Sequence, residues 1–424
     1  MADLVPLRAI RFDPAVVHLG GVLAPPYDVI SRAQQDALYG RDLRNIVRVD
    51  YGQELPDDVP GVRDRYSRAQ AHLQSWRQLG VLVQDASPSF YVSEQRFTMP
   101  DGTAQVRRGL FARVRAVPWE QSELRPHERT LRGPKEDRLA LMRATRTQTS
   151  AVFAVWRGAP GVSALLGEAT VGPAAAGGRT EGEFGSEKHL LWVIDDPARV
   201  AAIREAAAGA ELYLADGHHR YETAAAYAAE RAAAGDDATA DSQFALVYVC
   251  DADDPGISLL PTHRLLQPRP DAAYSLDDLW MRLDDGWDLV GATDLAAAVT
   301  AAAAARQGRH AIAVRSHEGS AVLSRPRRAT ASPRQGLDVV VLQEEVLGPA
   351  GADPEAIREG ALRYTRSVEE VEARVTSRES LLGFCLNPAT TAEMIAVADA
   401  GEVMPQKSTY FYPKVPTGLV LSPL

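Results

Sequence analysis

The stretch Leu212-Tyr-Leu-Ala-Asp-Gly-His-His-Arg-Tyr-Glu-Thr-Ala224 decides the fold. A short apolar run breaks at Asp216-Gly217 and continues into two histidines, an arginine and an alanine-rich segment. This order predicts a strand that leads directly into a helix. The first backbone N–H groups of a helix, together with its dipole, favour an anion, and Gly217 would let a ligand approach the backbone closely. We therefore expect an anionic group at this turn.

The side chains around the turn suggest how an anion would be held. Zinc-binding histidines on a helix lie three or four residues apart, whereas adjacent positions point about 100° apart, so His218 and His219 are not expected to bind zinc together. One of them is expected to face a phosphate while the other packs below, with Arg220 as a charge clamp. Asp216 is expected to cap the helix or to act as a general base. The plain alternative is an ordinary N-capped helix with solvent-facing histidines.

The rest of the chain predicts an α/β fold of the mixed α+β kind, with mixed sheets and packed helices. Alternating or apolar runs predict strands over residues 188–194, 211–215, 244–250, 257–266 and 381–386. Hairpins are expected over 90–117, around Pro100-Asp101-Gly102, and over 310–324. Helices are expected after a cap at Ser31, over 65–80 and 339–347, and over 368–375 and 391–400.

The chain of 424 residues is long enough for two or three domains. Residues 1–157 are expected to form an N-terminal α/β domain with a hairpin and a basic loop. Residues 158–182, rich in Gly, Ala and Pro, are expected to be a linker or a surface excursion. Residues 183–350 would form a central domain that carries the Asp-Gly-His-His-Arg motif, and residues 351–424 an α/β segment that packs back on the core.

Composition limits the classes of function. A net charge of −10 and a pI near 5.5 argue against a general nucleic-acid binder. Residues 107–146 are an exception, with eleven Lys or Arg against five Asp or Glu, and this region is either a functional patch or a solvated arginine-rich face. Cys250 and Cys385 lie in apolar runs, which is typical of buried thiols in a reducing cytoplasm. No signal peptide or membrane span is expected.

Lysine usage points to four positions. Only Lys135, Lys188, Lys407 and Lys414 are lysine, out of 46 basic residues. Arginine cannot replace lysine where a compact ammonium group must meet a phosphate, so these four are candidates for function, with chance retention as the alternative.

Two further segments can place polar groups in a pocket. Tyr27-Asp28 lies on a proline-stiffened loop that can hold a carboxylate near a substrate, although Asp28 can equally cap the next helix. The segment Pro261-Thr-His-Arg264 interrupts an apolar strand and forms either a pocket wall or a sheet edge with a bulge.

Two more segments carry donors suited to phosphate. His127-Glu128, on the basic loop, would serve in acid/base chemistry or phosphate contact, or would belong to a flexible solvated cluster. Lys407, Ser408, Thr409 and Lys414 resemble a phosphate-binding set, whereas a packed aromatic plug explains the intervening residues 410–412 equally well.

Taken together, six motifs resemble those of the bacterial domain of unknown function 1015 (DUF1015) family over nearly the whole chain. That resemblance implies no particular activity. The motifs are Ala24-Pro-Pro-Tyr-Asp-Val-Ile-Ser31, Asn45-Ile-Val-Arg48, His127-Glu128 with Gly133-Pro-Lys135, Ala215 to Ala224, Leu260-Pro-Thr-His-Arg264 and Met404-Pro-Gln-Lys-Ser-Thr-Tyr-Phe-Tyr-Pro-Lys414.

The Asp216-Gly-His-His-Arg220 element is also similar to the signature of the ParB/sulfiredoxin-like superfamily, which includes free-serine kinases and in which such a turn holds nucleotide phosphates. Members of that superfamily act as DNA clamps, sulfinic acid reductases or amino-acid kinases, so the fold does not choose the reaction. The motif has no neighbouring cysteine, which counts against a reductase. An evident helix-turn-helix is missing too, which counts against a DNA clamp.

Together, the motifs and the superfamily resemblance favour a nucleotide-binding phosphotransferase acting on a small hydroxylated metabolite such as serine, with ATP or ADP and Mg²⁺ as cofactors. Its expected location is the cytoplasm. The alternatives are a non-catalytic sensor of a nucleotide or other anionic ligand, and nucleic-acid processing through residues 107–146. Catalysis is assigned to Asp28, Asp216 and His219. The residues expected to bind the nucleotide are Gly217, His218, Arg220, Lys407, Ser408, Thr409, Lys414, His127, Lys135, His263 and Arg264.

Overall fold

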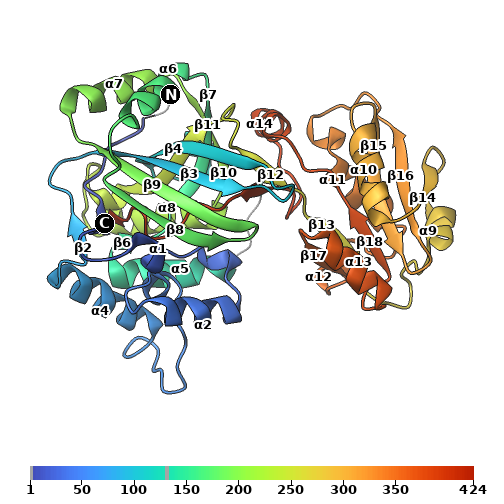
Figure 1. Cartoon of the computed structure of the whole chain (residues 1–424), viewed down its shortest axis with the longest axis horizontal. Coiled ribbons are helices and arrows are strands. Elements are labelled where there is room, and N and C mark those ends of the chain that lie inside the picture. Colours follow the sequence, from blue (N-terminus) through green and yellow to red (C-terminus); the bar gives the residue numbers. More distant parts are fainter. Residues whose placement is uncertain (1–2, 129–132) are drawn as a thin grey trace. The chain divides into compact units, whose positions relative to one another are not determined.

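The predicted strand-to-helix turn is present in the computed structural model, which describes residues 3–128 and 133–424. Strand β10 (Glu211–Asp216) ends one residue before helix α8 (His218–Ala233), and Gly217 lies between them. The predicted mixed α/β class is confirmed, because helices pack on mixed and antiparallel sheets (Figure 1).

The described residues divide into two compact units. Unit 1 comprises residues 3–126, 133–258 and Pro413–Leu424, and unit 2 comprises 127–128 and Leu259–Tyr412. This division differs from the three predicted segments 1–157, 183–350 and 351–424. Segment 1–157 and the first part of segment 183–350 contribute strands to one sheet, and the last segment is split between the units at residue 413.

Unit 1 is built on an eight-stranded mixed sheet in the order β5-β10-β7-β11-β4-β3-β9-β8. Strand β10 is parallel to β5 and antiparallel to β7, and β7 is parallel to β11, whereas the remaining neighbours are antiparallel. The bounds of the other strands are β3 (Phe90–Thr98), β4 (Ala104–Arg115), β5 (Leu124–Arg125), β7 (Val152–Arg157), β8 (Ala176–Gly182), β9 (Gly185–Ile194) and β11 (Phe244–Asp251).

Short strand pairs and helices complete unit 1. Strand β1 (Ile10–Phe12) pairs with β2 (Leu82–Gln84), and β20 (Ser422–Pro423) pairs with β6 (Thr147–Gln148). The other helices are α1 (Leu19–Val22), α2 (Arg32–Arg41), α3 (Val47–Asp50), α4 (Arg65–Gln78), α5 (Gly133–Thr145), α6 (Pro160–Ala169) and α7 (Pro197–Ala207).

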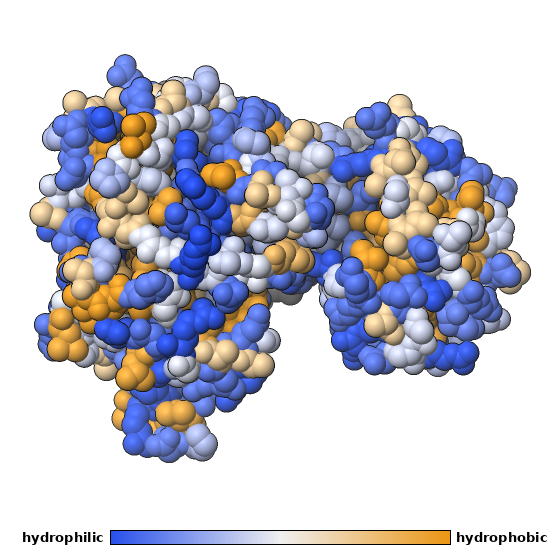
Figure 2. All heavy atoms as spheres, viewed as in Figure 1, coloured by the Kyte–Doolittle hydropathy of each residue, from blue (hydrophilic) through white to orange (hydrophobic). Residues whose placement is uncertain are grey.

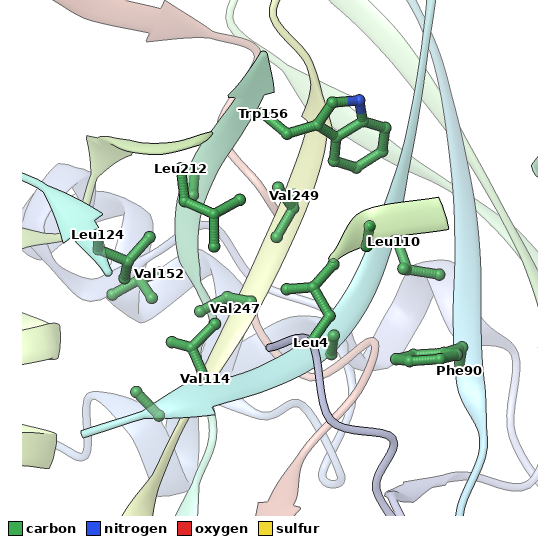
Figure 3. Close-up of a cluster of buried hydrophobic side chains, with 14 of the residues drawn as sticks. Leu4, Phe90, Leu110, Val114, Leu124, Val152, Trp156, Leu212, Val247 and Val249 are labelled. Carbon is green, nitrogen blue, oxygen red and sulfur yellow. The ribbon is translucent and has the colours of Figure 1, made fainter. Parts of the chain in front are cut away.

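The core of unit 1 lies between this sheet and several helices. Figure 3 shows Trp156 of β7, Leu212 of β10 and Val249 of β11 among its labelled side chains. Residues of α6, α7 and α8 belong to the same buried cluster. Each large apolar side chain buried in this way contributes about 1.5–3 kcal/mol, which fixes α8 against the sheet and with it the turn at Gly217.

The predicted linker over 158–182 is wrong. It contains α6 and the edge strand β8, which pairs with β9 along its whole length. The glycines of this segment made it look like a loop, but they are needed for close packing. A Cβ at Gly178 would lie 2.5 Å from the backbone nitrogen of Gly20 in α1, and one at Gly177 would lie 2.9 Å from a methyl carbon of Leu190.

Unit 2 is built on a six-stranded antiparallel sheet in the order β14-β16-β15-β18-β13-β17, and α10 and α13 supply part of its core. The sheet strands are β13 (His263–Leu266), β14 (Asp288–Ala292), β15 (Arg309–Ser316), β16 (Ser320–Pro326), β17 (Leu362–Thr365) and β18 (Leu382–Cys385). A separate pair is formed by β12 (Ser258–Leu260) and β19 (Tyr410–Tyr412). The helices are α9 (Leu276–Arg282), α10 (Leu295–Ala305), α11 (Asp338–Val341), α12 (Pro354–Arg358), α13 (Val368–Thr376) and α14 (Thr391–Asp399).

Most predicted elements are confirmed within a few residues, including both hairpins and the cap at Ser31, which forms a capping box with Gln34. The two cysteines are buried free thiols, as predicted. Within residues 3–128 and 133–424, no helix combines the length and apolar character needed to cross a membrane. Hydrophilic residues cover much of the face shown in Figure 2, and hydrophobic ones gather there in smaller groups.

Candidate functional site

The turn between β10 and α8 is shaped by Gly217 and Arg220. Gly217 has a φ of +92°, and a Cβ there would lie 2.9 Å from the guanidinium carbon of Arg220. The Arg220 side chain therefore folds back over the turn, where Nη2 donates to Asp216 Oδ2 at 2.6 Å. No side chain caps α8, so the predicted Asp216 cap is wrong: the carboxylate takes an ion pair instead.

Asp216 is held from a second side by Lys414. Lys414 Nζ lies 2.7 Å from Asp216 Oδ1, so both carboxylate oxygens face cations. Burial alone would raise the pKa of the Asp216 carboxyl, but the charges of Lys414 and Arg220 hold that pKa well below its usual range. A carboxylate held in this way is a poor proton acceptor near neutral pH.

The two histidines differ in their surroundings. His218 is buried, and its ring packs 6.2 Å from that of Trp119, as predicted for the imidazole that packs below. The alternative of two solvent-facing histidines is therefore wrong for His218. His219 is partly buried, and its carbonyl accepts a hydrogen bond from Thr223 Oγ1 at 2.7 Å.

A pocket lies beside the first two turns of α8. It leaves about 40 Å³ for the centres of water molecules, whereas one water needs about 10–15 Å³. The space suits a few waters or one group of the size of a phosphate or carboxylate. The polar residues that line it are Tyr27, Asp50, Arg138, Thr147, Gln148, Thr149, Ser150, Arg220 and Thr223, and the apolar ones are Leu141, Met142, Val152, Ala245 and Leu246.

Asp50 gives this pocket its unusual feature. Its side chain is almost fully buried at the end of α3. Oδ1 accepts hydrogen bonds from Thr149 Oγ1 at 2.6 Å, from Ser150 Oγ at 3.4 Å and from Arg138 Nη1 at 3.5 Å. The buried Oδ2 accepts none from the described residues. Because the large majority of buried polar side-chain atoms have a hydrogen-bond partner, Oδ2 is an acceptor that a water or a ligand group can fill.

Arg138 and Tyr27 form the neighbouring wall. The guanidinium of Arg138 lies 4.1 Å from the centre of the Tyr27 ring, and its Nη1 donates to the Asp50 carbonyl at 2.6 Å. Burial, followed by the charge of Asp28, raises the pKa of Tyr27 to about 12. The Tyr27 hydroxyl therefore keeps its proton and can donate.

Asp28 itself is exposed and does not line the pocket. Its charge is close enough to contribute to the raised pKa of Arg220. The alternative that Asp28 caps the next helix is wrong, because Ser31 does so.

The basic region predicted over 107–146 is not a solvated face throughout. Arg107 is fully buried, and Arg113 and Arg138 are nearly so. Lys135 pairs with Glu222, which also accepts from Trp119 Nε1 at 2.8 Å, so Lys135 links α5 to α8. The tip of this loop, residues 129–132, lies outside the described residues.

The remaining predicted residues belong to unit 2. His127 is only 1% exposed, and its Nε2 lies 2.9 Å from Thr409 Oγ1, so a flexible solvated cluster is wrong for this histidine. Arg264 and Ser408 line a second pocket. The pocket-wall interpretation of the Pro261 segment is confirmed, and the sheet-edge alternative is wrong because β13 lies between β18 and β17.

Lys407, His263 and the aromatic residues 410–412 also belong to unit 2. Lys407 is exposed, with a φ of +61°. Burial lowers the pKa of His263 to about 4, so that its Nδ1 accepts the backbone N–H of Leu386 as a neutral ring. The aromatic plug is confirmed for Phe411 and Tyr412, which are fully buried, whereas Tyr410 is only partly buried.

Sequence reasoning missed Asp50, Arg138, Thr149 and Ser150 as pocket residues. A weak signal exists for Asp50, which ends a largely apolar run that follows Asn45. Asn45 Nδ2 donates to the carbonyls of Gly21 and Leu23, at 2.7 and 3.0 Å, and so fastens this run to the segment before the Tyr27 loop.

No group of three or more His, Cys, Asp or Glu side chains that could hold a metal ion occurs among residues 3–128 and 133–424. Magnesium is usually bound through one or two carboxylates together with substrate phosphates.

Comparison with known proteins gives one family match: a family model described as "Protein of unknown function (DUF1015)" matches residues 4–340. No curated protein sequence matches the chain. Among solved structures, a conserved hypothetical protein from Pyrococcus furiosus is 15% identical, with 74% of this chain and 95% of that chain covered and a TM-score of 0.37.

Two other solved structures are similar to the same degree. A free serine kinase in complex with AMP is 15% identical, with 73% of this chain and 92% of that chain covered and a TM-score of 0.37. SbnI with a C-terminal truncation, from Staphylococcus aureus, is 11% identical, with 74% and 87% covered and a TM-score of 0.35. At these values the likeness bears on neither ligand nor activity here.

Proposed function

This chain belongs to the DUF1015 family, and we propose that it is a nucleotide-dependent phosphotransferase whose acceptor is a small hydroxylated metabolite, with serine as one candidate. The observation that carries the proposal is Asp50: this residue lines a pocket together with Arg138 and Arg220, and its buried Oδ2 accepts no hydrogen bond from the described residues. An anionic carboxylate oxygen beside two cations suits a ligand that presents a hydroxyl next to negative charge.

Asp50 would act on the acceptor hydroxyl. Thr149 occupies Oδ1 at 2.6 Å, which orients the carboxylate and leaves Oδ2 to receive the hydroxyl hydrogen. As the acceptor oxygen bonds to phosphorus, its proton passes to Oδ2 and the bond to the leaving phosphate breaks. Asp216, predicted for this role, is already held by Lys414 and Arg220.

The cations and the start of α8 would hold the phosphate. Arg138 and Arg220 line the pocket, and the N-terminal dipole of α8 adds positive potential at the adjacent turn. The hydroxyl of Tyr27 is a further donor. Because the pocket has room for only one phosphate-sized group, it would receive the transferred phosphoryl group and the acceptor oxygen, and the rest of both substrates would lie outside it. A bound ATP would supply the phosphoryl group.

Calorimetric titration with ATP and ADP tests the binding half of the proposal. Wild-type protein is expected to bind one of them, and Arg138→Gln and Tyr27→Phe are expected to bind at least about tenfold more weakly, since each removes a proposed donor to phosphate. Arg63→Gln, which removes an exposed guanidinium paired with Asp57, is the control and should bind like wild type. Wild-type protein without measurable affinity for either nucleotide would refute the proposal.

A non-catalytic sensor of an anionic ligand is the second candidate. The two ion pairs of Asp216 favour this candidate, because they give that carboxylate a structural role instead of a catalytic one. Tight nucleotide binding without phosphate transfer to any hydroxylated metabolite tested would select this candidate.

A further inference from the structure

Unit 2 contains a second pocket formed by two segments that are far apart in the sequence. Arg264, at the second position of β13, donates from Nη2 to the carbonyl of Lys407 at 3.1 Å. Thr262 and Ser408 line the same pocket. The segments around residues 261–264 and 404–409, both singled out from sequence, therefore converge on this pocket.

Arg264 is buried there without an acidic partner. Arg264 is only 3% exposed, and its guanidinium donates hydrogen bonds only to the carbonyls of Thr262 and Lys407. Burial lowers the pKa of Arg264 to about 10, and only Tyr364 and Glu128 lie close enough to offset that loss of solvation in part. Among residues 3–128 and 133–424, no Asp or Glu forms an ion pair with Arg264.

The other charges in this pocket are matched. Arg306 Nη2 lies 3.0 Å from Glu393 Oε2. Asp338 Oδ1 accepts from Arg327 at 2.9 Å and lies 2.8 Å from His310 Nδ1. Among the described charged side chains that line this pocket, Arg264 is thus the one without an ion-pair partner. Leaving a buried charge uncompensated is costly, so a site built in this way indicates a missing counter-charge.

The backbone around Arg264 is also specialised. Lys407 has a φ of +61°, a conformation that costs a residue with a side chain about 1 kcal/mol or more. In this conformation the Lys407 carbonyl accepts a hydrogen bond from the Arg264 guanidinium and helps to hold it in place. Strain of this kind is commonest where a side chain must be positioned for binding.

We propose that this pocket of unit 2 binds a small oxyanion, the carboxylate or phosphate of a free metabolite, on the guanidinium of Arg264. The pocket leaves about 20 Å³ for the centres of water molecules, so it receives the terminal group of the ligand. Thr262, whose hydroxyl bonds no described residue, is a second donor. This site is independent of the phosphotransferase proposed for unit 1.

The test compares Arg264→Gln with Arg363→Gln in the full chain. Arg363 lies on the neighbouring strand β17 and is exposed, so its variant removes the same charge from outside the pocket. The melting temperature is measured in sodium chloride, sodium acetate and sodium phosphate at one ionic strength, and the affinity for the stabilising anion is measured by calorimetry. Acetate and phosphate distinguish the two sources of the oxyanion.

Acetate or phosphate is expected to stabilise wild type and Arg363→Gln relative to chloride, and Arg264→Gln is expected to lose at least about tenfold in affinity. Because the pocket of unit 1 also attracts anions, the difference between the two variants is the readout. The proposal is overturned if neither anion stabilises wild type, or if Arg264→Gln gains as much as Arg363→Gln.

Should Arg264→Gln fail to fold, Arg264→Lys replaces it. Lysine keeps the charge but not the planar fork of donors, so the affinity is expected to fall at least about threefold. An unchanged affinity in Arg264→Lys would equally overturn the proposal.

Discussion

Lys414 and Asp216, which are far apart in the sequence, form an ion pair of 2.7 Å at the head of α8. The backbone that carries Lys414 is itself fixed: Arg107 Nη2 donates to the carbonyl of Pro413 at 2.7 Å, and Gln95 Nε2 donates to the carbonyl of Lys414 at 3.2 Å. The C-terminal segment is thereby tied to the turn that presents Gly217 and Arg220. Of the four lysines, Lys414 therefore has a structural role, as the second counter-charge of Asp216.

Replacing Lys414 by methionine is expected to destabilise the protein by about 2 kcal/mol, because Asp216 would keep only Arg220 as a counter-charge in a mostly buried position. Urea denaturation measures the change. Lys188→Met is the control, since Lys188 lies partly exposed on β9. Equal stability of the two variants would show that the ion pair contributes little.

Asp216 also predicts a dependence on acid. Its pKa is lowered in the folded state, so its contribution to stability is present above the unfolded pKa of about 4 and is lost as pH falls below that value. Between pH 6 and pH 3 wild type should therefore lose more stability than Lys414→Met does. Parallel curves of unfolding free energy against pH would be inconsistent with this role of the pair.

The raised pKa of Glu187 predicts that stability changes with pH in the opposite direction. Burial raises its pKa from 4.5 to about 7, which corresponds to about 3 kcal/mol. Its contribution to stability is present below about pH 4.5 and is lost as pH rises through about 7. Glu187→Gln keeps a partner for Gln95, which donates to the carboxylate at 2.8 Å, and should gain stability over wild type between pH 5 and pH 8.

Chemical denaturation at both pH values measures this gain. The buried histidines His189 and His263, whose pKa values burial lowers to about 4, change stability with the opposite sign between pH 4 and 6.5. Comparing variant and wild type at the same pH removes the contribution of His263. His189 lies 3.8 Å from Glu187, so its contribution is avoided by comparing the proteins above pH 6.5, where this histidine is neutral in both states. Glu181→Gln, on the exposed edge strand β8, should show no gain.

How far the sequence predicted this molecule depended on the range of the interactions involved. The turn at Gly217 and the box between Ser31 and Gln34 are local, and residues a few positions apart define both. The edge strand β8 was missed because its glycines are required by close packing against the backbone of α1, which is distant in the sequence.

The candidate site shows the same limit. Arg220 lies within the motif and was predicted, whereas Asp50, Arg138 and Thr149 come from three other segments that reach the pocket only through tertiary packing. Asp216 was predicted as a base because its sequence position suits one. Its actual chemistry depends on Lys414, a contact that no local pattern shows.

Gly217→Ala tests the geometry of the turn. The substitution forces an L-residue to a φ of +92° and places its Cβ against Arg220, so it should cost more than about 2 kcal/mol. Gly158→Ala is the matched control, because Gly158 has a similar φ of +83° but open space around its Cβ position. Urea denaturation should show a clear excess cost for Gly217→Ala; equal costs would mean that Arg220 does not depend on this close approach.

The most direct measurement is the rate at which labelled γ-phosphate of ATP passes to hydroxylated metabolites, serine included, with wild type and Asp50→Asn compared. Asparagine keeps the size of the side chain and an oxygen for Thr149, but it cannot take the hydroxyl proton. Transfer by wild type is predicted to slow at least about a hundredfold in Asp50→Asn while ATP still binds. Transfer at the same rate in both proteins would contradict the account, and so would no transfer by wild type to any acceptor.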